Sequence, residues 1–208
     1  EQVVPGQAVS NGFFIVALTT FAFFFEWGWS TWDRLRASSA TSLEVVLGKS
    51  LPRVVMSVVQ FVVVFAIGIP LFDLHVRGPI EALAPLVLAF AVCLVLLGVA
   101  VTAICRTAQE ANAFSVVGMV VFGAVGGALV PFSVLPGWAR TAAPVTPTYW
   151  AMRGFRSVIL DAQGVGGVTT PIGVLLGMSL VFAVVALRRL RFDEAKIKVG
   201  RYVFDRYG

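Results

Sequence analysis

The stretch of residues 83–105 reads LAPLVLAFAVCLVLLGVAVTAIC and contains no charged residue. At 1.5 Å of rise per residue, a helix of this length covers about 34 Å, which is enough to cross a hydrocarbon core of ~30 Å. Lipid offers no hydrogen bonds, so the backbone polar groups of such a stretch must be paired within it, as they are in a helix. Four more apolar runs that are long enough to span a membrane flank it, at residues 8–25, 51–72, 111–130 and 170–187. The sequence therefore predicts an all-α integral membrane protein with five transmembrane helices.

The composition of the whole 208-residue chain agrees with this class. Hydrophobic residues make up 58% of it and charged residues 13%, whereas soluble domains carry about 25% charged residues. No polar block is long enough for a separate soluble domain, so we expect one transmembrane domain over residues 1–208. The net charge of +5 indicates topology rather than nucleic-acid binding, because Lys and Arg mark the cytoplasmic loops of membrane proteins.

Lys and Arg are unevenly divided between the two sets of loops. With Glu1 outside, the inner loops and the tail at 188–208 hold 12 of them and the outer loops hold 4. This division predicts a multi-pass protein of the plasma membrane, or the inner membrane of a bacterium, with a cytoplasmic C-terminus. An odd number of spans with an outside start suggests one earlier span that is not in this chain, and thus five visible spans of six.

Two segments between the apolar runs have unusual composition. Residues 30–50 interleave charged and polar residues with Leu and Val, and they are too polar to span a bilayer. We expect them to form a short amphipathic helix–turn–helix on the cytoplasmic surface. Residues 131–168 are apolar but are interrupted by four prolines and many glycines. Short helices that re-enter the outer leaflet fit this second segment, since irregular backbone at that depth must be buried in protein or line a cavity.

Motifs that carry chemistry are missing from the sequence. We find no nucleophile–base set, no metal-ligand spacing and no paired carboxylates within the spans, so no catalytic or metal site is predicted. Gly48-Lys49-Ser50 resembles the end of a P-loop, but Leu43 stands where that motif needs a glycine. Cys93 and Cys105 lie too far apart along one helix to pair, and we expect them to be buried apolar residues.

The span cores also lack Asp, Glu, Lys and Arg, which argues against ion-coupled transport. Energy for transport would then come from elsewhere, and residues 30–50 would be the natural docking point for a cytosolic motor. A few polar side chains do lie in or near the spans, and each of them either bonds between helices or lines a substrate path: Ser57, Gln60, Thr102, Asn112 and Ser115. Gly123 with Gly127 and Gly173 with Gly177 have the GxxxG spacing of close helix packing.

Several stretches together resemble one family. Thr31-Trp32-Asp33-Arg34-Leu35, followed by Leu43-Glu44-Val45-Val46-Leu47-Gly48-Lys49, resembles the inner segment of ABC type-2 exporter permeases. The stretch from Gly126 to Trp138 resembles the outer signature of that family, and Thr146-Pro147-Thr148-Tyr149-Trp150 follows as it does there. Val4-Pro5-Gly6 resembles the entry to the family's second span, which agrees with a missing first span. Ser30 and Ser39 depart from the glycine and proline that the family usually has.

The resemblance implies the subunit of an exporter that moves an amphipathic drug, antibiotic or lipid. Two such permeases, identical or related, would pair within the lipid and recruit two cytosolic ATP-binding subunits. Those subunits would bind ATP and Mg, while this chain binds no cofactor and no nucleic acid and is not itself an enzyme. The residues expected to dock on the ATP-binding subunit are Asp33, Arg34, Leu35, Arg36, Ser38, Ser39 and Thr41. The residues expected at the extracellular gate are Phe132, Leu135, Trp138, Tyr149, Trp150, Arg153 and Arg156.

Two other classes of function stay open at this stage. A non-transport scaffold or regulatory subunit would need neither the amphipathic inner segment nor the proline-broken outer helices. A membrane-embedded enzyme would need clustered acid–base residues. Arg153, Arg156 and Asp161 are the candidates for such a cluster, and they have no nucleophile or metal ligand beside them.

Overall fold

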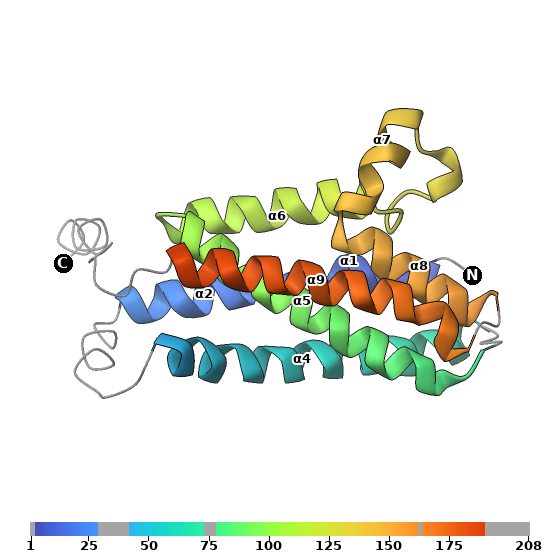
Figure 1. The fold of residues 1–208 in the computed structure, drawn as a ribbon, viewed down its shortest axis with the longest axis horizontal. Coiled ribbons are helices and arrows are strands. Elements are labelled where there is room, and N and C mark those ends of the chain that lie inside the picture. The colour runs from blue at the N-terminus through green and yellow to red at the C-terminus, as the bar shows by residue number, and fades with distance from the viewer. Residues whose placement is uncertain (1–2, 29–41, 73–77, 162–163, 190–208) are drawn as a thin grey trace.

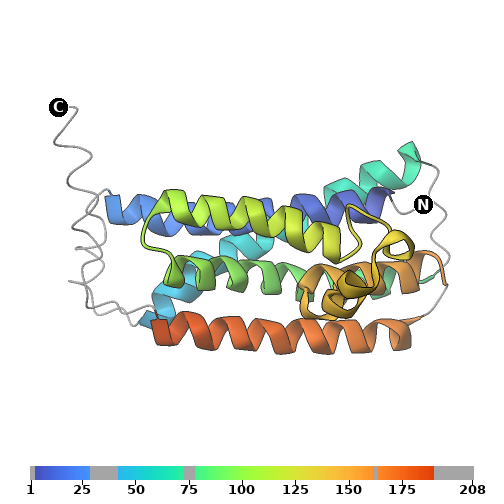
Figure 2. The same cartoon turned by 90° about the horizontal axis from the view of Figure 1, so that it is seen from above.

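The computed structural model describes residues 3–28, 42–72, 78–161 and 164–189. These residues form helices and connecting turns, with no strand among them. Five helical segments are long and apolar enough to span a membrane, namely Val4–Phe25, Glu44–Leu71, Ile80–Ile104, Ala108–Val125 and Gly166–Arg189. They lie side by side in an elongated bundle with alternating direction (Figures 1 and 2). The predicted all-α membrane fold is confirmed.

The first span consists of two helices, α1 (Val3–Gly12) and α2 (Phe14–Gly28). At the break, the Phe13 N–H donates to the Ser10 carbonyl at 3.2 Å and the Val16 N–H donates to the Phe13 carbonyl at 3.0 Å. These three-residue bonds tighten the chain locally, as in a 3₁₀ turn. A Cβ on Gly12 would lie 3.0 Å from both the Leu94 and the Phe61 side chains, so the break is packed closely against other helices.

The second span, α4 (Ser42–Leu71), begins nine residues before the predicted boundary at residue 51. Residues 42–50 therefore continue the spanning helix, and the prediction of a separate helix–turn–helix up to residue 50 is wrong over this part. The apolar run marks where lipid begins, but helical hydrogen bonding carries on through the polar turns beyond it. The rest of the predicted inner segment, residues 29–41, lies outside the described residues.

The centre of the bundle is α5 (Leu83–Ile104), which follows the short helix η1 (Ile80–Ala82). It packs against α2, α4 and α9 (Val165–Arg189). An aromatic contact connects it further to α4: the Phe61 ring lies edge-on to the Phe90 ring, with centroids 5.6 Å apart, and it stacks on the Phe155 ring at 6.2 Å. Because α5 has neighbours on most sides, it is the most buried of the five spans.

The fourth span, α6 (Ala108–Val125), begins with a reciprocal cap. The Thr107 hydroxyl accepts from the Glu110 N–H at 3.1 Å, and the Glu110 carboxylate accepts from the Arg106 N–H at 2.9 Å. The helix ends at Val125, whereas the apolar run predicted residue 130. Gly127 has a φ of +83°, a left-handed conformation that ends helices. The predicted GxxxG packing of Gly123 with Gly127 is therefore wrong, because Gly127 is not helical.

The proline-broken segment forms η2 (Phe132–Val134), α7 (Gly137–Ala142), η3 (Ala143–Val145) and α8 (Pro147–Ile159). The Thr146 hydroxyl caps the start of α8, and Pro147 occupies its first position, where a missing N–H costs little. α8 packs against α9, α5 and α1, while α7 projects sideways from the bundle (Figure 1). We call this end, where α1 and α5 begin, the α8 end. We call the opposite end, where α4 begins and α9 finishes, the α4 end.

Candidate functional site

Aromatic side chains from two parts of the proline-broken segment meet at the α8 end. The Tyr149 ring centroid lies 5.5 Å from that of Phe132 and 5.3 Å from that of Trp150. The Trp150 indole N–H donates to the Pro144 carbonyl at 2.8 Å, which fixes the ring. The Arg153 guanidinium carbon lies 5.4 Å from the centre of the Trp150 ring, within cation–π range. The structure thus brings together four residues of the predicted gate.

The other three predicted gate residues are divided. Leu135 is buried, whereas Trp138 on α7 is 72% exposed and does not join the aromatic group. Arg156 follows Arg153 by three residues on α8 and is exposed. Asp161 comes just after α8, and its N–H donates to the Arg156 carbonyl at 3.3 Å. No ion pair joins it to either arginine within the part of the chain that the structure describes, so these three residues form no acid–base cluster.

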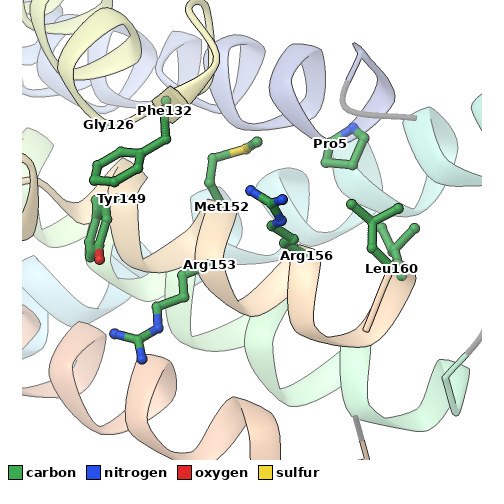
Figure 3. A pocket seen from close by; sticks show the side chains of 10 residues that line it. Pro5, Gly126, Phe132, Tyr149, Met152, Arg153, Arg156 and Leu160 are labelled. Carbon is green, nitrogen blue, oxygen red and sulfur yellow. The ribbon is translucent and has the colours of Figure 1, made fainter. Parts of the chain in front are cut away.

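A cavity of about 190 Å³ lies between α1, α8 and the turn that follows α6 (Figure 3). Four predicted gate residues line it, together with six residues that were not among the predicted site residues. The full lining is Pro5, Gly126, Gly127, Phe132, Tyr149, Met152, Arg153, Arg156, Ile159 and Leu160. Its walls are held closely together, because a Cβ on Gly6 would lie 2.4 Å from the Ala128 carbonyl oxygen. A side chain at that position would push α1 away from the cavity.

A hydroxyl group connects the two helices beside this cavity. Thr148 on α8 donates from its Oγ1 to the Phe122 carbonyl in the last turn of α6 at 2.5 Å. A Cβ on Gly126 would lie 1.9 Å from the same Oγ1, so the helices can approach this closely only with glycine at that position. Both residues belong to stretches that carry the family resemblance, but neither was among the predicted site residues. The Thr-Pro start of α8 could have located Thr146 as a cap, but no sequence signal pairs Thr148 with Gly126.

The predicted docking residues 33–36, 38, 39 and 41 lie outside the described residues. The first turns of α4 that follow them are described, and they pack on the end of α2. The Lys49 Nζ lies 4.6 Å from the centre of the Phe23 ring, and the Arg53 guanidinium donates to the Lys49 carbonyl. Val46 and Phe23 are buried together in a small core cluster with Val99, Ala103 and Ala186. The start of α4 therefore shares a buried cluster with α2, α5 and α9.

The five candidate path residues do not meet at one place. The hydroxyls of Thr102 and Ser115 bond to carbonyls four residues earlier in their own helices, at 2.8 Å each. They are therefore satisfied within one helix, and the alternative of bonds between helices does not hold for these two. Asn112 is exposed and Gln60 is half-buried. Ser57 is fully buried, and its hydroxyl has no hydrogen-bond partner among the described residues.

A second cavity of about 260 Å³ lies between α2, α5 and α6. Ser115 is the polar side chain in a lining that is otherwise apolar, formed by Phe13, Val16, Leu97, Val101, Phe114, Val117, Gly118, Val121 and Phe122. Phe13 belongs to the break in the first span. Ser115 is thus a predicted path residue that lines this cavity.

Cys93 and Cys105 are both buried and no disulfide joins them, as predicted. Within the described ranges, no three His, Cys, Asp or Glu side chains are close enough together to hold a metal ion. Gly173 and Gly177 have nothing within 4 Å of a built Cβ, so this second predicted GxxxG pair makes no helix contact inside the described chain.

Comparisons with known proteins agree with the sequence resemblance. The family described as "ABC-2 type transporter" matches residues 3–160. The chain is 26% identical over 160 residues to the linearmycin resistance permease protein LnrN of Bacillus subtilis (strain 168), covering 77% of this chain and 41% of that protein. It is 25% identical over 117 residues to the probable multidrug ABC transporter permease YbhR of Escherichia coli (strain K12), covering 56% and 32% respectively. The chain spans less than half the length of these curated relatives.

Proposed function

Because the chain belongs to the ABC-2 type transporter family and is an ABC transporter permease, we propose that it exports an amphipathic molecule, such as a drug, an antibiotic or a lipid. The observation that carries this proposal is the family match over residues 3–160, which includes the inner segment and the helices at the α8 end. The names of the two relatives, a linearmycin resistance permease and a probable multidrug permease, support a drug-like cargo.

The energy for this export would come from a separate subunit. An ABC-2 permease is the membrane component, and it works with an ATP-binding partner. We propose that two copies of that partner bind ATP and Mg, and that a second permease, identical or related, completes the path. Asp33, Arg34 and the residues up to Thr41 would dock on the partner. Since α4 begins directly after this segment, the helix would act as a lever that moves α2 and α5.

The orientation follows from the distribution of charge. Lys49, Arg53, Arg106, Arg188 and Arg189 belong to the α4 end among the described residues, and Arg140, Arg153 and Arg156 to the α8 end. Lys and Arg concentrate on the cytoplasmic side of membrane proteins. We therefore propose that the α4 end and the C-terminus are cytoplasmic and that the α8 end is outside. In this orientation α7 and α8 form part of the outer gate.

The proposal is tested by efflux from cells. Cells that express the full-length permease with its ATP-binding partner should accumulate less of a fluorescent amphipathic dye than cells without them, and ATP depletion should abolish the difference. A double variant, Asp33→Ala with Arg34→Ala, should lose most of the efflux because the docking contact is weakened. Arg140→Ala, an exposed cation at the opposite end, is the control. Equal dye levels with and without the wild-type pair, over a range of amphipathic dyes, would count against export.

A further inference from the structure

The cavity at the α8 end is lined by positively charged side chains and by no negatively charged one. Its lining contains Arg153 and Arg156 and no carboxylate. Figure 3 shows the Arg156 guanidinium on the same side of α8 as Met152, toward Pro5, while the Arg153 guanidinium lies on a different side. Within the described residues, the Arg156 guanidinium has no ion pair and no hydrogen bond to another side chain. Arg156 is exposed at the cavity, so its guanidinium can form charge-assisted hydrogen bonds to an anion that enters from outside.

The rest of the lining is apolar, which restricts the kind of anion. Pro5, Met152, Ile159 and Leu160 form the wall around Arg156. An arginine can form two parallel hydrogen bonds to a phosphate, while such a wall favours hydrocarbon. The matching ligand is therefore an anion that is attached to an apolar group rather than a fully hydrated ion.

The size of the cavity restricts the ligand further. Pockets that enclose a whole drug-sized molecule usually measure roughly 300–1,000 Å³, and this cavity measures about 190 Å³. It can hold a headgroup and the first carbons attached to it, with the remaining hydrocarbon outside. A phospholipid, whose tails stay in the bilayer, meets this condition.

The position of the cavity along the bundle agrees with such a ligand. Tyr149 borders it, and Trp150 packs beside Tyr149 with its N–H bonded to the Pro144 carbonyl. Tyr and Trp collect at the level of lipid headgroups in membrane proteins. Arg156 lies two turns further along α8 toward the end of the bundle (Figures 1 and 3). By this rule Arg156 lies on the headgroup side of the two rings, within reach of lipid phosphates.

We propose that this cavity binds the headgroup of an anionic phospholipid, with Arg156 as the residue that binds the phosphate. Such a lipid would contact α1, α8 and the turn after α6 at once, and it would hold the three segments together. The site goes beyond the proposed export function, because the lipid held there need not be the cargo and the proposal does not depend on which end is outside.

The test uses the full-length protein with its ATP-binding partner, purified in mild detergent. The melting temperature is followed while phosphatidylglycerol, phosphatidylcholine or inorganic phosphate is added, and retained lipid is identified by native mass spectrometry. Phosphatidylglycerol should raise the melting temperature more than phosphatidylcholine, and inorganic phosphate should have no effect. Arg156→Gln should weaken the apparent affinity for phosphatidylglycerol about tenfold or more, since a charge-assisted bond is lost.

Two further variants serve as controls for this test. Arg140→Gln removes an exposed cation of the same end that does not line the cavity, and it should bind phosphatidylglycerol like the wild type. If Arg156→Gln folds poorly without lipid, Arg156→Lys keeps the charge and should retain part of the affinity. The proposal is overturned if Arg156→Gln binds phosphatidylglycerol as the wild type does, if phosphatidylcholine binds equally well, or if inorganic phosphate alone reproduces the effect.

Discussion

At the scale of single residues, the most specific contact is the one between Thr148 and the end of α6. Its hydroxyl bonds to the Phe122 carbonyl and fits only because Gly126 has no side chain. The Phe122 carbonyl also accepts from the Gly126 N–H at 2.8 Å. Loss of the hydroxyl would therefore remove a bond between helices without leaving that carbonyl unpaired.

Replacement of Thr148 by valine keeps the shape of the side chain and removes this bond, together with the 3.1 Å bond from the same hydroxyl to the Thr146 hydroxyl. Hydrogen bonds between membrane helices contribute roughly 0.6–1.7 kcal/mol, so Thr148→Val should lower the free energy of unfolding by about 1 kcal/mol. Thr141→Val is the matched control, because the exposed Thr141 hydroxyl bonds only to the Gly137 carbonyl of its own helix. Reversible unfolding in mixed micelles measures the free energy of unfolding of the two variants and of the wild type. Equal stability of Thr148→Val and wild type would show that the contact does not hold α6 to α8.

At the scale of helices, the uninterrupted start of α4 has a functional consequence. If the inner segment is pushed by an ATP-binding partner, the helix must be rigid between Ser42 and the lipid to transmit the push. Gly48 lies in this stretch, is exposed, and has open space where a Cβ would be. A substitution there tests the backbone of the lever without disturbing its packing.

Proline at position 48 should uncouple ATP hydrolysis by the complex from efflux. Gly48→Pro removes a helical hydrogen bond and clashes with the preceding turn, at a cost of about 3 kcal/mol or more. We expect the complex to keep its ATP hydrolysis and to lose most of its efflux. Gly48→Ala should behave like the wild type or better, because alanine favours the helix. Normal efflux by Gly48→Pro, at normal amounts of protein in the membrane, would contradict the proposed role of α4 as a lever.

The helices also show where prediction from sequence stops. Length and apolarity identified all five spans, because crossing lipid demands both. They placed the end of α6 five residues too late, since Gly126 to Val130 are apolar while Gly127 takes a left-handed conformation that hydropathy does not report. Length and apolarity also missed the break at Phe13 and the early start of α4, because hydropathy does not report backbone conformation or where helical hydrogen bonding begins. Four of the seven gate residues predicted from the resemblance line the cavity, but Pro5 and Met152 reach it only through the packing of α1 against α8.

At the scale of the whole molecule, the orientation in the membrane can be measured. In a chain with Cys93→Ala and Cys105→Ala, a cysteine at exposed Trp138 lies at the α8 end and one at exposed Gln109 lies at the α4 end. A membrane-impermeant maleimide added to intact cells should label Trp138→Cys and leave Gln109→Cys unlabelled until the membrane is opened. The reverse pattern would place the α8 end in the cytoplasm and would rule out its role as an outer gate.

The central claim is that this permease works as part of an ATP-driven complex, and isolation of that complex tests it most directly. The full-length protein is pulled down in mild detergent, its partners are identified by mass spectrometry, and ATP hydrolysis is assayed. We predict that a P-loop ATP-binding subunit is recovered in an active complex, and that Asp33→Ala with Arg34→Ala greatly reduces its recovery. Isolation of the wild-type protein alone, or with partners that have no ATP site, would contradict the account and favour a scaffold or regulatory role.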